Sequence, residues 1–206
     1  MPHPARFAGA LLAIGATLLG VGYWIEGKAW LAQRLLERSW IAHLEDGRAH
    51  PPWPWADHHP VARLRTHGVA GGDQDFIVLN GDAGNVLAFA PGHTPGSGLP
   101  GSDETIVISG HRDTHFRFLE HLPIAAEIEL QARGTTTRFS VIGRQIVDAR
   151  TWRQPIRTDR RLILVTGWPV GAVISSPARL LIIAEAIDRT SAPLSTQPHA
   201  VRPLST

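Results

Sequence analysis

Three positions at the ends of apolar segments have residue types and spacing that could do chemistry together. His111 follows a β-branched run, residues 105–109, and a second such run ends at Gly167. The last apolar run of the chain opens with Arg179. A histidine in a loop between strands can act as general acid or base, and an arginine at a strand mouth can stabilise an oxyanion. The pattern therefore predicts two parts of a catalytic site, with no nucleophile between them.

Nearby hydroxyl groups are poor substitutes for that nucleophile. Thr166 directly precedes the glycine, but adjacent residues of a strand point to opposite faces. Ser175 and Ser176 lie in the loop before the arginine, and nothing in the sequence presents them to His111. An alternative interpretation of the spacing stays open, in which the histidine and the arginine are ordinary surface residues.

Other histidines and one aspartate near these positions allow further hypotheses. His115 comes four residues after His111, a zinc-binding spacing on a helix, but the glutamate of a His-Glu-x-x-His motif is absent. Asp113 could orient His111 or a loop backbone, or cap the turn that follows, and we expect capping. We expect His58 and His59, in a segment with four prolines, to be solvated rather than to bind metal.

Composition limits the function classes. The 206 residues include no cysteine, which excludes disulfides, thiolate metal sites and a cysteine nucleophile. The net charge is only +2, and the basic residues are scattered without a block of like charge. The chain therefore has no nucleic-acid footprint, and we expect neither a cofactor nor a metal.

The chain divides into four parts. Residues 1–27 are predicted to be a membrane anchor, because residues 7–25 carry no charge over about the length that crosses a bilayer. Residues 28–60 are predicted to form an amphipathic helix, ended at Gly47, and a Pro-rich linker. The folded domain is expected over residues 61–187, followed by a disordered tail, residues 188–206, that is rich in Ser, Thr and Pro.

The folded domain is predicted to be all-β with minor helix, a closed or nearly closed barrel of about eight strands. Short β-branched runs recur along it and are separated by Gly and Pro turns. Strands are expected at residues 62–69, 76–80, 105–109, 126–130, 137–142, 145–148, 161–167 and 179–184. Residues 91–101 are expected to form a long Gly/Pro loop, and residues 116–122 a helical turn.

Four stretches resemble the sortase family, most closely its proteobacterial, Gram-negative type. Two of them, LAFAPGHTPGSGLPG and TIVISGHRDTHFRFL, resemble the region that carries the family histidine, which falls on His111. IVDAR and ARLLI resemble later segments, and the family arginine falls on Arg179. LILVTGWP resembles the strand end Thr-Leu-Val-Thr-Cys-Tyr-Pro, so the position of the nucleophilic cysteine falls on Gly167.

The resemblance implies a sortase-type barrel and a transpeptidase or hydrolase activity. In the family, a thiolate attacks the threonyl carbonyl of a Leu-Pro-x-Thr-type C-terminal sorting signal, the histidine protonates the leaving amine, and an amine or water releases the acyl-enzyme. The resemblance also implies that residues beside His111 and Gly167 bind substrate. These residues are Asp113, Thr114, Thr166 and Trp168. Because glycine has no side chain, this chain is expected to be a sortase by descent that is inactive as written.

Two other functions stay open beside this one. The chain could be a non-catalytic protein that binds sorting peptides, or a periplasmic metal-binding domain that uses His58, His59, His111 and His115. The expected partners are a C-terminal sorting signal, an amine acceptor of unknown identity and the inner membrane. The expected location is the inner membrane, crossed once, with the C-terminal domain in the periplasm.

Overall fold

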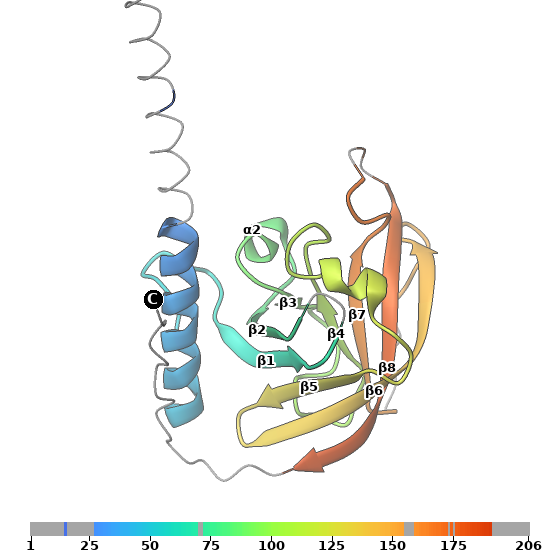
Figure 1. The fold of residues 1–206 in the computed structure, drawn as a ribbon. Coiled ribbons are helices and arrows are strands. Elements are labelled where there is room, and N and C mark those ends of the chain that lie inside the picture. Colours follow the sequence, from blue (N-terminus) through green and yellow to red (C-terminus); the bar gives the residue numbers. More distant parts are fainter. Residues whose placement is uncertain are drawn as a thin grey trace, which may run out of the picture.

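Eight strands close into a barrel in the order β1-β2-β3-β4-β7-β8-β6-β5, as Figure 1 shows. The computed structural model describes residues 15, 27–69, 72–154, 159–172, 174 and 176–190. The pairs β2–β3 and β4–β7 are parallel and the other pairs are antiparallel. The prediction of a closed barrel of about eight strands with minor helix is confirmed.

The described elements of the barrel domain have the following bounds: β1 Pro60–Thr66, β2 Gln74–Asn80, α2 Gly84–Leu87, β3 Gly92–His93, β4 Ile106–Ser109, η1 Arg117–His121, β5 Glu127–Ala132, β6 Thr135–Asp148, β7 Arg161–Gly167 and β8 Ala178–Thr190.

The two strands that lead to the predicted site are buried on both faces. One face of β4 and β7 joins the barrel core through residues such as Ile106 and Leu164. The other face, with Val107 and Val165, packs beneath the partly buried Trp152. A parallel pair covered on both sides needs a continuous apolar sequence, which explains why these two strands were predicted correctly from composition alone.

Several predicted boundaries were wrong. The two strands expected at residues 137–142 and 145–148 form one strand, β6, because Gly143 sits at a bulge rather than at a turn. The predicted disordered tail begins too early, since Asp188 pairs with Arg138 and β8 continues to Thr190. Residues 92–93 of the expected loop form the short strand β3.

A helix over residues 27–46 precedes the barrel, as predicted, and Gly47 ends it with a φ of 74°. Leu36 and Trp40 on this N-terminal helix are buried against Leu79 of β2 and Val86 of α2. The helix therefore docks on the barrel through one apolar face.

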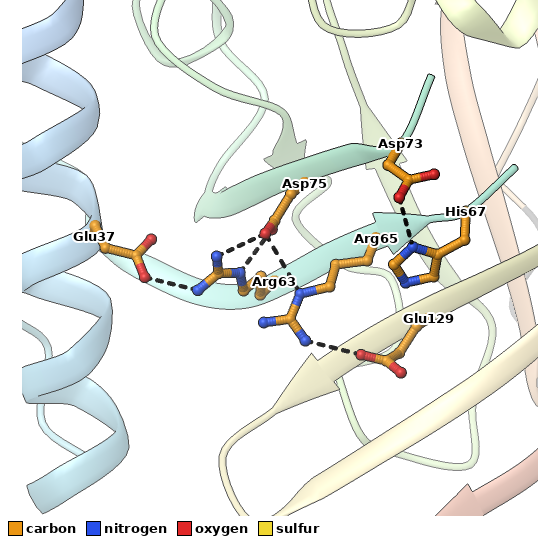
Figure 2. Close-up of polar contacts among 7 residues, drawn as sticks. All are labelled: Glu37, Arg63, Arg65, His67, Asp73, Asp75 and Glu129. Carbon is orange, nitrogen blue, oxygen red and sulfur yellow. Dashed lines mark hydrogen bonds and ion pairs between the residues drawn. The ribbon is translucent and has the colours of Figure 1, made fainter. Parts of the chain in front are cut away.

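Charged side chains reinforce this docking at the edge of the interface (Figure 2). Arg63 of β1 donates to Glu37 of the helix at 2.7 Å and, through Nε, to Asp75 of β2 at 2.6 Å. Arg65 forms ion pairs with both Asp75 and Glu129 of β5. Its Nε lies 3.5 Å from the Asp75 carboxylate, and its Nη1 lies 3.0 Å from the Glu129 carboxylate. One network thus connects the helix to three neighbouring strands.

The Pro-rich linker is not simply a solvated connection. His58 was predicted to be solvated, but it is only 5% exposed, beside Trp53 and Phe89. This desolvation lowers the pKa of His58. The prediction failed because the ring that covers His58 belongs to Phe89, which lies far from it in the sequence.

The predicted membrane anchor falls almost wholly outside the described residues. Of the charge-free segment, only residue 15 is described. Among the parts of the chain that the structure describes, no helix is both long and apolar enough to span a bilayer.

Candidate active site

The strands β4 and β7 place the histidine loop beside Gly167. They run parallel, with Ser109 opposite Val165. Beyond this pair, the Gly110 N–H donates to the Val165 carbonyl at 2.9 Å, and the Thr166 hydroxyl donates to the Gly110 carbonyl at 2.8 Å. The chain therefore leaves β4 at His111 while it is still tied to the end of β7.

Arg179 is brought to the same place by strand pairing. It lies directly opposite Gly167 across the antiparallel pair β7–β8. Its Nη1 donates to the carbonyls of Ser176 and Ala178, both at 2.9 Å, and these bonds orient the guanidinium. Arg179 and Gly167, which are 12 residues apart in the sequence, are therefore neighbours in the fold.

A cleft of about 480 Å³ opens over these strand ends. The described residues that line it are Asp82, Leu87, Ser109, Gly110, His111, Arg112, Asp113, Val165, Thr166, Gly167, Ser176 and Arg179. All three residues predicted for the catalytic site therefore line one cleft.

Arg112 is a residue of the cleft that sequence analysis missed. Its Cδ lies 3.0 Å from the position that a Cβ on Gly167 would take. Its guanidinium donates to the carbonyls of Pro169, at 3.3 Å, and Ala172 in the β7–β8 loop. A cationic side chain thus covers the place from which a nucleophile would project.

Asp113 joins the histidine loop to the β7–β8 loop. Its carboxylate accepts the Gly171 N–H at 3.0 Å and Arg112 Nε at 3.2 Å. The bond from Gly171, followed by that from Arg112, holds the pKa of Asp113 below its usual value. The prediction that Asp113 caps the following turn was wrong, because η1 has no side-chain cap.

His111 is exposed at the rim of the cleft. Its Nδ1 accepts the backbone N–H of Asp113 at 3.3 Å, so Nε2 is the ring nitrogen that stays available as a donor. Thr114, predicted to bind substrate, is also exposed, and its N–H donates to the His111 carbonyl at 3.4 Å. The loop backbone, rather than a buried carboxylate, orients the imidazole.

The other predicted positions have mixed environments. Trp168 is partly buried against the main core, and its backbone N–H donates to the Ala178 carbonyl at 3.0 Å. Ser176 lines the cleft, but its Oγ accepts the Ala178 N–H at 3.1 Å. Thr166 is buried, and its hydroxyl donates to the end of β4. Ser175 lies outside the described residues.

The histidines do not gather as the metal hypothesis requires. His115 is half-buried with its ring edge-on to Phe76 at 5.7 Å, and burial, followed by the charge of His111, lowers its pKa. Over the described ranges, no group of three or more His, Asp or Glu side chains could hold a metal ion. The hypothesis of a metal site made from His58, His59, His111 and His115 therefore gains no support.

Comparison with known proteins gives the family. The family model described as the sortase domain matches residues 69–187, which is more than half of the chain. The chain therefore belongs to the sortase family. A search of curated proteins gave no match.

Solved structures agree on the fold. A Clostridium perfringens sortase D5 transpeptidase is 15% identical with a TM-score of 0.62, and the match covers 77% of this chain and 99% of that one. A lid mutant of sortase A from Corynebacterium diphtheriae is 21% identical with a TM-score of 0.57, over 79% and 93% of the two chains. Sortase A of Listeria monocytogenes is 14% identical with a TM-score of 0.57, over 65% and 91%. At these identities the likeness concerns the fold alone.

Proposed function

We propose that this chain is a sortase by descent that binds Leu-Pro-x-Thr-type C-terminal sorting signals. Because position 167 is a glycine, the chain does not cleave them. By its sequence motifs it would be one of the membrane-anchored sortases of the proteobacterial type. The domain would stand in the periplasm on a single anchor in the inner membrane. The amine that would accept the peptide stays unassigned.

One observation carries this proposal. Gly167 lies opposite Arg179 and lines the same cleft as His111, so the two polar parts of the family site stand on either side of a position without a side chain. The cleft has a volume of about 480 Å³. A peptide can be bound through its backbone carbonyls and side chains, and such binding does not require a thiol.

The lost nucleophile accounts for the proposed inactivity. Removing the nucleophile of a catalytic triad costs on the order of a million-fold in rate. The hydroxyl of Thr166 is already bonded to Gly110, and that of Ser176 accepts a backbone N–H. Neither geometry supports a second nucleophile that would act with His111.

The test is direct binding of the full chain, in detergent, to a panel of fluorescent Leu-Pro-x-Thr-type peptides. We expect saturable binding without cleavage. Arg179→Ala should weaken it by about tenfold or more, because a charged hydrogen bond of about 1.4 kcal/mol would be lost. Arg138→Ala is the matched control and should bind normally. Arg138 lies in β6 opposite Asp188, whereas Arg179 lies opposite Val147 near the other end of that strand pair. If the unaltered chain binds no peptide of the panel, the proposed function is wrong.

A further inference from the structure

Large apolar side chains are exposed on one surface beside the cleft. Trp55 is 80% exposed, Trp30 62%, Leu31 51% and Phe89 38%. We call these four residues the aromatic surface. Tryptophan contributes more apolar area than any other side chain, so two exposed tryptophans in one region mark a contact surface.

Contacts between neighbouring residues show that the parts of the aromatic surface lie together. Gln33, one turn after Trp30, donates from Nε2 to the Phe89 carbonyl at 3.0 Å. The Phe89 ring lies 5.0 Å from Trp53, two residues before Trp55 in the linker. The first turns of the N-terminal helix, the linker and the segment after α2 therefore form one region.

The sequence that precedes this region indicates what covers it. The charge-free residues 7–25 end five residues before Trp30. If they span the bilayer, the first turn of the helix must lie at the membrane–water boundary, where tryptophan is favoured. Arg34 lies over the Trp30 ring at 5.3 Å, and its guanidinium can reach lipid phosphates while the ring is in the interface.

We propose that the aromatic surface inserts into the lipid interface and holds the barrel against the bilayer. This inference rests on the proposed membrane location and adds a second, reversible contact to the anchor. Exposed apolar residues also occur elsewhere on the described part of the chain. Ile142, Ile146 and Ile187 are aliphatic and lie along β6 and β8.

The contact would place the cleft next to the membrane. Leu87 of α2 lines the cleft, and Phe89, two residues later, belongs to the aromatic surface. Figure 1 shows α2, the first turns of the N-terminal helix and the β7–β8 loop at the same end of the molecule.

Because the chain has no cysteine, single introduced thiols can be labelled cleanly. Pro54→Cys places a fluorophore beside the exposed Trp55 and leaves the aromatic surface intact. Ile187→Cys is the control, since Ile187 is 51% exposed near the end of β8, which Figure 1 shows at the opposite end of the molecule. Each full chain is reconstituted into phosphatidylcholine–phosphatidylglycerol vesicles that contain a headgroup-level spin-labelled quencher lipid.

We expect quenching of the label at position 54 and none at position 187. In the Pro54→Cys chain, Trp30→Ala together with Trp55→Ala should abolish the quenching while the protein still floats with the vesicles. If the chain floats but the label at position 54 is not quenched, or if the double alanine change leaves quenching intact, the aromatic surface is not a membrane contact. If the chain does not float, the anchor itself is wrong and this inference falls with it, whereas peptide binding is measured separately.

Discussion

Arg112 takes the space that a side chain at Gly167 would occupy: its Cδ lies 3.0 Å from the position of a Cβ there. The contact is with a flexible side chain and not with backbone. Gly167 also has no left-handed φ that would require glycine. A thiol can therefore be restored at this position after a small shift of Arg112, which makes the site testable.

A thiol introduced by Gly167→Cys should have a low pKa. Arg112 and Arg179 line the same cleft as Gly167, and nearby cations favour the thiolate. We expect the pKa to fall below the ordinary value of about 8.5. The rate of iodoacetamide alkylation against pH measures it directly, because no other cysteine competes.

The matched variant is Gly167→Cys with Arg112→Gln. Removing the cation beside the thiol should raise the pKa again and slow alkylation at neutral pH. A pKa at or above the ordinary thiol value in the single variant, or no response to Arg112→Gln, would show that the arginines of the cleft do not stabilise a thiolate at position 167.

Arg63→Met should destabilise the protein by about 1–2 kcal/mol, since it removes charged hydrogen bonds to Glu37 and Asp75 but keeps most of the side-chain volume. The Arg63 side chain is only 18% exposed, although its partners are 39% and 46% exposed. Urea unfolding measures the change. Arg138→Met is the control, because Arg138 also contacts two carboxylates but is 48% exposed. An effect of Arg63→Met no larger than that of the control would show that the network of Figure 2 does not secure the helix.

Asp75 should make stability depend on acid pH. Burial alone would raise its pKa, but hydrogen bonds and charge from Arg63, with help from Arg65, outweigh burial and lower it. The folded protein therefore binds this proton less tightly than the unfolded chain does. The stabilisation is present above the unfolded pKa of about 3.9 and is lost as the pH falls through the lower, folded pKa.

The measurement is the free energy of unfolding of the unaltered chain and of Asp75→Asn from about pH 6 to about pH 3. The unaltered chain should lose more stability over this range than the variant, which lacks the titrating group. The comparison is necessary because Asp113 and Asp148 also have lowered pKa values. Parallel curves for the two proteins would rule out the contribution of Asp75.

The sequence was most informative where burial is continuous. The apolar runs at β4 and β7 required a doubly covered strand pair, so the strands and their ends at His111 and Gly167 could be predicted. Gly143 was misleading, because a glycine within a β pattern can mark a turn or a bulge, and only the long pairing of β6 with β8 decides between them.

Contacts between distant segments could not be predicted in the same way. The burial of His58 depends on Phe89, and the position of Arg112 depends on carbonyls of the β7–β8 loop. Asp113 was expected to cap its own turn, but it accepts an N–H from Gly171 across 58 residues. No local pattern encodes such contacts, since they arise only when the barrel closes.

We propose that this protein has a sortase site that lacks only its nucleophile. The most direct test is cleavage and transfer of Leu-Pro-x-Thr-type peptides by the full chain, compared with Gly167→Cys and with the isosteric control Gly167→Ser. We expect turnover only with Gly167→Cys, about a thousand-fold or more above the unaltered chain. His111→Ala or Arg179→Ala in that background should abolish the gain. Equal activity of the unaltered chain and Gly167→Cys, or no turnover by Gly167→Cys of a peptide that demonstrably binds, would show that more than the nucleophile is missing or that another residue attacks.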